Sequence, residues 1–247
     1  MDPISLVIVF IVGIAASFIG SVAGGGGGLL SIPALILMGL PPNIAIATNR
    51  LGSLGLAGSS IYKFAKSKKI IYSYAPVFII LAIIGSIIGA NLLVHIDVQL
   101  LSKIVGIFIL LPLPLLFIKN KGLKREKPSK LSRNFGYAAY FLVAIYDAFF
   151  GAGTGLVAIY ILVFTVGLPL IESMALDRIS SVFSAVLATI IFAYFGIIDY
   201  QVGIVLLIGM VLGGYIGTRT AIKKGNKFVK FAFAIVIIAS AIKLIFF

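Results

Sequence analysis

Residues 21–54 read SVAGGGGGLLSIPALILMGLPPNIAIATNRLGSL, and residues 149–182 read FFGAGTGLVAIYILVFTVGLPLIESMALDRISSV. The second stretch lies 128 positions after the first, and no gap is needed to align them. Both contain a glycine-rich run, an apolar segment, a Gly-x-Pro turn and an arginine among apolar residues. Unrelated apolar sequences share Ile, Leu and Val, but they do not bring Gly, Pro and Arg into one register. The two stretches therefore indicate an internal duplication.

The offset of 128 residues also relates small and polar residues elsewhere in the chain. The matched pairs are Gly25 with Gly153, Gly27 with Gly155, Gly39 with Gly167, Pro41 with Pro169, Arg50 with Arg178, Ser53 with Ser181, Tyr72 with Tyr200, Gly85 with Gly213 and Gly89 with Gly217. The last two pairs form Gly-x-x-x-Gly patterns, which are typical of close helix packing. We divide the chain into a first half, residues 1–118, a basic linker, residues 119–134, and a second half, residues 135–247.

The composition is that of a membrane protein. Apolar residues make up 61% of the chain, and the mean hydropathy is +1.21. Charged residues make up 11%, whereas a soluble domain carries about 25%. So few charges could not cover a water-soluble fold of this size. We therefore expect an all-α protein with several membrane-spanning helices.

Ten hydrophobic segments can be placed along the chain, five in each half. The first two segments of each half are short or flank a glycine-rich break, so each either crosses the membrane or re-enters it. The N-terminal segment lacks the basic residues of a signal peptide and is predicted to be retained. The predicted segments are 4–22, 28–40, 43–63, 71–94, 99–118, 134–150, 154–168, 171–195, 200–222 and 227–247.

The distribution of Lys and Arg predicts the orientation of the two halves. Most of the twenty basic residues lie at 63–69, 119–133 and 219–230, which the positive-inside rule places in the cytoplasm. The repeat equivalent of 63–69 is 191–197, which has no basic residue. Equivalent loops are thus predicted on opposite sides of the membrane, as in an inverted-topology repeat. Each half then makes an odd number of crossings, either five or three plus a re-entrant pair, and both termini face outward.

The same features exclude several classes of function. The formal charge of +13 would suit a nucleic-acid-binding protein only if it lay on one soluble face, so no nucleic-acid partner is expected. The chain has no cysteine and one histidine, His95, which excludes thiolate chemistry and Cys or His metal clusters. No Ser–His or Cys–His constellation supports an enzyme. We expect no enzymatic activity, no cofactor and no metal, and a lipid bilayer around a protein of the cell membrane.

The glycine-rich breaks are the first candidate for a binding site. Irregular backbone inside a membrane is confined to the protein interior or to a water-lined cavity, and broken segments at matching places in two inverted halves point to a transporter's binding site. A half-helix that begins at such a break favours an anion at its N-terminus. Close helix packing is the alternative reason for the glycines. The candidate residues are Gly25, Gly26, Gly27, Gly28, Gly151, Gly153, Thr154 and Gly155.

Each half also carries one arginine about two turns into an apolar segment. Such a residue is expensive in a membrane and indicates a functional site, and arginine can hold an oxyanion with two parallel hydrogen bonds. Arg50 has no acidic neighbour in sequence, which favours an anion or a helix C-terminus as its partner. Arg178 could instead pair with Asp177 or Asp147, or cap a neighbouring helix. The polar faces comprise Asn49, Arg50 and Ser53 in the first half and Asp177, Arg178 and Ser181 in the second.

Three acidic residues lie in apolar surroundings in the second half, Asp147, Glu172 and Asp177. A buried carboxylate can carry a proton, so Asp147 and Asp177 are candidates for proton coupling. Glu172 lies near a predicted helix start, where it would interact with the helix dipole. The first half has no acid at the equivalent positions. A coupling-ion path would explain this asymmetry, and so would an ordinary buried salt bridge.

These motifs together resemble the TauE/SafE family. The resemblance rests on the run Gly24–Gly28 with Pro33, on the Gly39-x-Pro41 turn, on Ala47-Thr48-Asn49 and on their counterparts at 151–155 and 167–169, and it covers residues 5–245. It implies an exporter of sulfite, organosulfonates or related sulfur-containing anions across the cytoplasmic membrane, with the proton gradient as a candidate driving force. The second half has Ile161 where the first has Pro33, and Asp177 where it has Asn49, so the two half-sites need not be equal.

We therefore expect a secondary transporter that moves a small anion by alternating access. Its central site would lie where the glycine breaks face each other, with Arg50 and Arg178 supplying positive charge. Two alternatives stay open. One is a cation– or metabolite–proton exchanger that uses Asp147 and Asp177, and the other is a passive anion channel. No oligomeric state is predicted.

Overall fold

The computed structural model describes residues 1–25, 27–101, 103–104 and 128–246, with side chains up to residue 225 and at residues 228 and 229. Within these ranges every regular element is a helix. The all-α class predicted from the composition is therefore confirmed.

Two helices of the first half begin at a proline. Pro3 opens α1, and Pro42 opens α3; the missing N–H of proline has no helical partner in the first turn anyway. Gly39, in the turn before α3, has a φ of 97°, which glycine adopts without strain. The helices are α1 (Pro3–Val22), α2 (Gly27–Leu37), α3 (Pro42–Lys66) and α4 (Ala75–His95).

The second half follows the same order of elements. Gly167, the repeat equivalent of Gly39, has a φ of 74° and ends a π-helical turn. α8 begins and ends 128 residues after α3 does. Gly225, with φ 74° and ψ −173°, interrupts α9. The elements are α6 (Lys130–Phe149), α7 (Thr154–Ile161), the π-helical turn η2 (Leu162–Val166), α8 (Leu170–Tyr194) and α9 (Tyr200–Phe246).

Most of segment 99–118 lies outside the described residues, and segment 227–247 falls on the part of α9 that follows Gly225. Residues 130–134, which we assigned to the linker, belong to α6. Ser129 accounts for this earlier start, because its hydroxyl accepts a hydrogen bond from the Ser132 amide at 3.1 Å and caps the helix.

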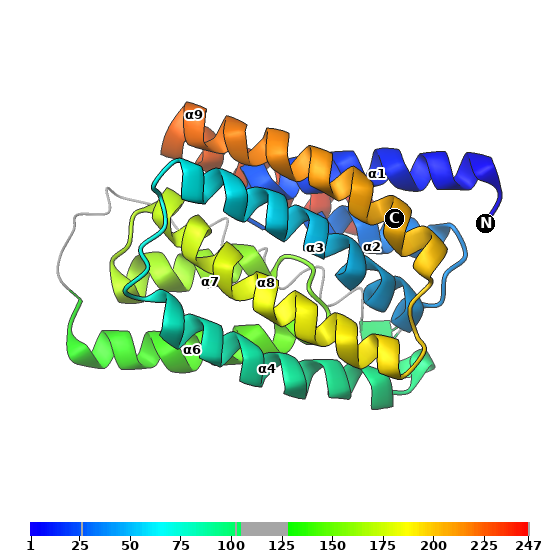
Figure 1. Cartoon of the computed structure of the whole chain (residues 1–247), viewed down its shortest axis with the longest axis horizontal. Coiled ribbons are helices and arrows are strands. Elements are labelled where there is room, and N and C mark those ends of the chain that lie inside the picture. The colour runs from blue at the N-terminus through cyan, green and yellow to red at the C-terminus, as the bar shows by residue number, and fades with distance from the viewer. Residues whose placement is uncertain (26, 102, 105–127, 247) are drawn as a thin grey trace.

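Long helices pack in pairs that join the two halves (Figure 1). α1 lies along α9, α6 lies along α4, and α3 contacts α8 between these pairs. Glycines allow the close contacts, because a Cβ at Gly213 or Gly217 would meet the backbone of α1, and one at Gly85 or Gly89 the backbone of α6. The helix-packing role predicted for both Gly-x-x-x-Gly patterns is therefore confirmed.

The direction of each helix can be followed in Figure 1. α1, α3 and the part of α9 that precedes Gly225 run from the end of the molecule that holds the N-terminus towards the opposite end, whereas α4, α6 and α8 run the other way. Helices that the 128-residue offset relates, such as α3 and α8, thus run in opposite directions.

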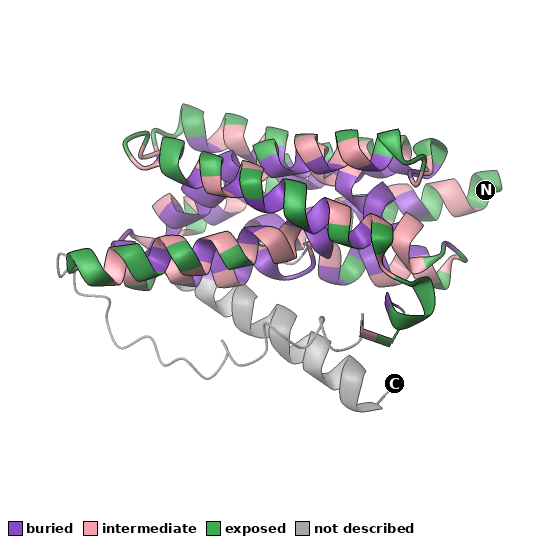
Figure 2. Ribbon diagram, turned by 90° about the horizontal axis from the view of Figure 1, so that it is seen from below, coloured by how far each residue is buried: buried purple, intermediate pink, exposed green. Residues whose placement is uncertain are grey.

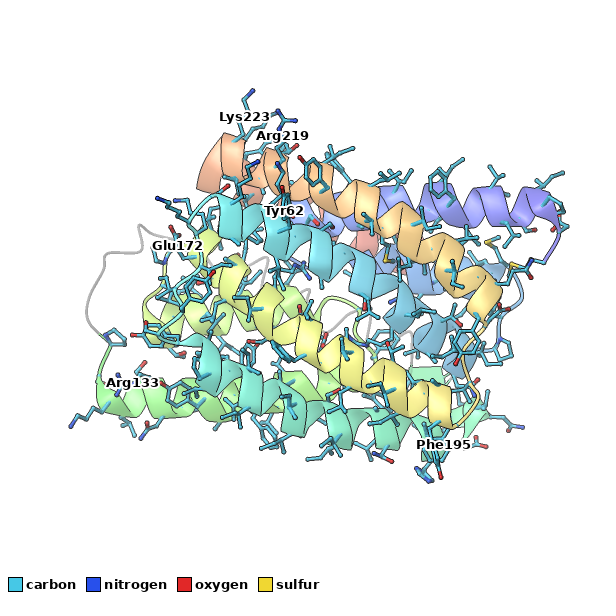
Figure 3. The ribbon with its side chains drawn as sticks, in the orientation of Figure 1. Tyr62, Arg133, Glu172, Phe195, Arg219 and Lys223 are labelled. Carbon is cyan, nitrogen blue, oxygen red and sulfur yellow. The ribbon has the colours of Figure 1, made fainter. Side chains whose placement is uncertain are left out.

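The outer surface and the lengths of the helices fit a membrane protein. Figure 2 shows exposed residues along the outward faces of the helices and buried residues between them, and many of the exposed residues are Ile, Leu, Val or Phe. Charged residues gather at one end, where Figure 3 labels Arg133, Arg219 and Lys223. Four described helices are long and apolar enough to cross a membrane, namely Pro3–Val22, Ala75–His95, Leu170–Tyr194 and Tyr200–Gly225.

Candidate functional site

The two glycine-rich breaks lie directly against each other. A Cβ on Gly25 would come within 2.7 Å of the Gly155 backbone, and a Cβ on Gly155 within 2.8 Å of the Gly24 carbonyl oxygen. Only glycine permits so close an approach of two backbones. α2 begins just after the first break and α7 just after the second, so the N-termini of both short helices start at this contact.

A cavity of about 70 Å³ lies beside the contact. This is several times the 10–15 Å³ that one water molecule needs, which suits a small polyatomic ion. Of the predicted site residues, Gly153 does not line the cavity, and Gly26 lies outside the described residues. The predicted residues that do line it are Gly25, Gly27, Gly28, Asn49, Arg50, Ser53, Asp147, Gly151, Thr154, Gly155, Asp177, Arg178 and Ser181.

Arg50, which is buried, and Asp147, which is partly exposed, form an ion pair between the two halves. Nη1 of Arg50 lies 3.1 Å from Oδ2 of Asp147. The same carboxylate accepts hydrogen bonds from the hydroxyls of Thr154 at 2.6 Å and Ser184 at 3.1 Å. Three donors match the charge and the lone pairs of an ionised carboxylate. An anion or a helix C-terminus was favoured as the partner of Arg50 because no acid is near it in sequence, but the acid that it meets comes from α6, 97 residues away in the chain.

The second terminal nitrogen of Arg50 is not satisfied in the same way. Nη2 is buried and has no hydrogen-bond partner among the described residues. It lies against Gly151, where a Cβ would come within 3.0 Å of it and where φ is 80°. A buried donor without a partner costs about 1–3 kcal/mol. An oxyanion in the cavity would relieve this cost by accepting a hydrogen bond from Nη2.

Arg178 has a different environment from Arg50. It is 8% exposed, and its Nη2 donates to the carbonyl oxygen of Gly20 at 3.2 Å, near the C-terminus of α1, where the helix dipole favours a cation. Among the described residues no carboxylate lies within 4 Å of Arg178. Of the alternatives for this arginine, capping a neighbouring helix is the one observed, and an ion pair with Asp177 or Asp147 is not.

The carboxylate of Asp177 accepts fewer hydrogen bonds from the described residues than the carboxylate of Asp147 does. Asp177 is 5% exposed, and the described residues offer its carboxylate one long hydrogen bond, from the Tyr140 hydroxyl at 3.4 Å. Asn49, its repeat equivalent, accepts a hydrogen bond from the Ser31 hydroxyl at 2.5 Å. The two acids of the cavity therefore differ, and Asp177 is the one whose negative charge has fewer partners.

The two serines on the arginine faces donate to backbone carbonyls. The hydroxyl of Ser53 lies 2.7 Å from the carbonyl oxygen of Arg50, and that of Ser181 lies 3.1 Å from the carbonyl oxygen of Arg178. A hydroxyl that donates to the preceding turn presents only its acceptor lone pairs elsewhere. Both serines thus make the cavity polar, and Arg50 and Arg178 are its positively charged side chains.

The charges of the cavity nearly balance. Arg50 and Arg178 contribute two positive charges, and Asp147 and Asp177 contribute two negative charges when both are ionised. The N-termini of α2 and α7 add partial positive charge of about half a unit each. A proton on Asp177 would leave the side chains with one net positive charge.

Sequence reasoning missed Tyr140 and Ser184. Both line the cavity, and their hydroxyls donate hydrogen bonds to its acidic residues. The residues at the repeat-related positions are Val12 and Leu56, so comparison of the halves could not reveal them. Helical spacing is the signal that could have done so. Tyr140 lies seven residues before Asp147, and Ser184 seven residues after Asp177, which places each on the face of its helix that carries the acid.

Comparison with known proteins agrees with the membrane-transport interpretation. The family described as "Sulfite exporter TauE/SafE" matches residues 9–244. A protein of Haemophilus influenzae named "Probable membrane transporter protein" is 32% identical, with 91% of this chain and 88% of the relative covered. "Probable membrane transporter protein YfcA" of Escherichia coli K12 is 30% identical, with 100% and 91% covered. "Probable membrane transporter protein YunE" of Bacillus subtilis is 25% identical, with 98% of each chain covered.

No solved structure gives a significant match to the chain. The family match covers nearly all of the sequence, and two of these relatives exceed or reach 30% identity over nine tenths of it or more. The chain is therefore a membrane transporter protein of the sulfite exporter TauE/SafE family.

Proposed function

We propose that the protein is a secondary transporter that exports sulfite, an organosulfonate or a related small sulfur-containing anion by alternating access. The cavity beside the glycine breaks is the substrate site in this proposal. One observation carries it: Arg50 lines this cavity, and its guanidinium nitrogen Nη2 is buried without a partner among the described residues. The description of the matching family as a sulfite exporter supports the choice of anion.

The two halves are, in the same proposal, inverted repeats that rock against each other. Support comes from the opposite directions of α3 and α8 and of the other related helices (Figure 1). Further support comes from the ion pair between Arg50 and Asp147, which joins α3 of one half to α6 of the other. Rocking would separate the glycine contact at Gly25 and Gly155 and open the cavity to one side at a time.

Proton coupling at Asp177 belongs to the proposal as well. A monovalent anion entering beside an ionised Asp177 meets a cavity with no net side-chain charge, whereas protonation of Asp177 makes the cavity cationic. Anion and proton therefore bind cooperatively, and each favours the other by the same factor. A divalent anion that leaves with one proton still carries one negative charge outward. The inside-negative membrane potential favours that export by about 2.3 kcal/mol per 100 mV.

Flux from proteoliposomes tests the proposed function. Vesicles loaded with sulfite or with a small organosulfonate are expected to release it through the purified protein, with a rate that saturates and that rises when the interior is made negative. Saturation is expected because each transport cycle must bind the anion in the cavity. Protein-free vesicles are the control. Flux of cationic metabolites without anion flux would favour the cation–proton exchanger, and a rate that does not saturate would favour a channel.

Asp177→Asn is expected to remove the pH dependence of anion binding. In the parent protein, affinity for a small organosulfonate, which stays ionised over this pH range, should fall as the pH rises and the proton leaves Asp177. Arg178, Tyr140 and Asp147 are the other charged or titratable groups around it. The variant should bind at all pH values about as tightly as the protonated parent, which is about 5–150-fold tighter than the ionised parent. Titration calorimetry over a pH series from about 5 to 9 measures this.

Asp97→Asn is the matched control for this substitution. Asp97 is exposed and accepts a hydrogen bond from the Leu100 amide at 2.9 Å, and asparagine caps a helix equally well. The control should keep the pH dependence of the parent protein. If Asp177→Asn also keeps it, the proton is carried elsewhere.

A further inference from the structure

A groove runs along the outer surface between α3 and α9. Its open space is about 470 Å³, and along α3 its lining runs over nine residues, from Leu54 to Tyr62, which corresponds to about 12 Å. It lies apart from the central cavity, with which it shares no lining residue. The residues that define it include Leu54, Gly58, Tyr62, Leu207, Val211 and Tyr215.

Gly58 leaves the floor of the groove open without serving helix packing. Gly55, one turn earlier, is needed for packing, because a Cβ there would collide with the carbonyl oxygen of Leu207 on α9. At Gly58 a Cβ would meet nothing within 4 Å, and the residue is exposed. A glycine in an exposed helix costs about 1 kcal/mol relative to alanine. Its effect here is to keep a channel of apolar surface unfilled.

Aromatic and basic side chains close one end of the groove. The rings of Tyr62 and Tyr215 stack with their centroids 6.5 Å apart, and Nζ of Lys63 lies 4.1 Å from the centroid of Tyr215. Lys66 and Arg219 follow one helical turn after the two tyrosines, and both are exposed. Figure 3 shows Tyr62 and Arg219 together at the charged end of the molecule. Tyrosines with basic neighbours are typical of the level at which lipid headgroups lie.

No described carboxylate neutralises these cations. In the part of the chain that the structure describes, no carboxylate lies within 4 Å of the charged groups of Lys63, Lys66 and Arg219. Glu172, a nearby acid at this end, is paired with Lys69 at 3.3 Å. The end of the groove therefore carries a net positive charge that is open to an external anion.

We propose that this groove binds an anionic phospholipid, with one acyl chain lying over Gly58 and the phosphate contacting Lys63, Lys66 and Arg219. The occupant follows from the two ends of the groove, because an apolar channel that leads into uncompensated positive charge matches an acyl chain joined to an anionic headgroup. Each basic residue near such a headgroup strengthens binding about fivefold. The groove is lined in part by α3, the helix that also carries Arg50.

Binding of spin-labelled phosphatidylglycerol to the full-length protein in non-ionic detergent tests the proposal, with spin-labelled phosphatidylcholine as the uncharged comparison. The parent protein should prefer phosphatidylglycerol. Lys63→Gln combined with Arg219→Gln should weaken its binding about 25-fold and leave phosphatidylcholine unchanged. Gly58→Phe should weaken the binding of both lipids, since the ring would occupy the place of the acyl chain, and its thermal unfolding should match that of the parent protein.

Matched controls separate this site from general surface effects. Lys130→Gln combined with Lys223→Gln removes the same charge from exposed positions at the same end, and Ala138→Phe adds the same ring to an exposed position on α6. Neither control should change the affinity for phosphatidylglycerol. The proposal is overturned if the charge control weakens binding as much as Lys63→Gln with Arg219→Gln. It is also overturned if Gly58→Phe still binds like the parent, or if Gly58→Phe dissociates a dimer, which would show that a second copy of the chain fills the groove.

Discussion

Arg178→Gln is expected to slow sulfite export at subsaturating concentration by about 10- to 100-fold. The substitution keeps a polar but shorter side chain, and it removes one of the two positive charges of the cavity and the hydrogen bond to the Gly20 carbonyl. A hydrogen bond to a charged group contributes about 1.5–3 kcal/mol, which sets the size of the effect. Initial rates from proteoliposomes at several sulfite concentrations measure it.

Two further variants separate the charge of Arg178 from its shape. Arg178→Lys keeps the charge but loses the planar fork that can hold an oxyanion with two bonds, so its rate should lie between those of the parent protein and Arg178→Gln. Lys223→Gln removes an exposed charge from α9, far from the cavity lining, and should leave the rate unchanged. If Arg178→Gln transports as fast as Lys223→Gln, Arg178 takes no part in anion binding.

The position of the candidate cavity could be predicted because the repeat marks it twice. Glycine is the residue that lets two backbones meet, and its presence at matching places predicted the contact that Gly25 and Gly155 make. The same register predicted that Arg50 and Arg178 face one cavity. Helix boundaries were also predictable where prolines and glycines set them, as at Pro42 and Gly167.

The partners of the charged residues could not be predicted from the repeat. Both arginines occur at the same place in their halves, yet Arg50 meets a carboxylate and Arg178 meets a backbone carbonyl. The difference arises from Asp147, whose repeat-related residue is Ile19. A sequence comparison reports that the halves differ at this position, but only the fold, which brings Asp147 of α6 beside Arg50 of α3, decides which arginine the acid reaches.

This asymmetry gives the two halves of the site different tasks in the proposed transport cycle. Arg50 is held by a carboxylate with two further donors and offers the cavity one free nitrogen. Arg178 has no such carboxylate among the described residues, and its neighbour Asp177 has only one long hydrogen bond there. We therefore expect the second half to carry the reversible protonation, and the pair of Arg50 and Asp147 to maintain the contact between the halves.

Asp147→Asn should accordingly destabilise the protein by about 3–5 kcal/mol, because it leaves the charge of Arg50 buried without a counter-charge. Unfolding in detergent would then begin of the order of 10 °C lower than in the parent protein. Arg50→Gln combined with Asp147→Asn removes both charges and should recover most of that loss, whereas it should not recover anion transport. The four proteins form a double-mutant cycle whose interaction energy reports the pair.

Sulfite adds a second measurement to this cycle. In Asp147→Asn the free anion can take the place of the lost carboxylate beside Arg50, so sulfite should raise the unfolding temperature of this variant more than that of the parent protein. A ligand at 100 times its Kd stabilises the folded state by about 2.7 kcal/mol, which is enough to detect. The double variant lacks the arginine and should gain the least from sulfite. A loss of less than about 1 kcal/mol in Asp147→Asn would contradict the argument, because the charge of Arg50 would then have to be neutralised by a group other than Asp147.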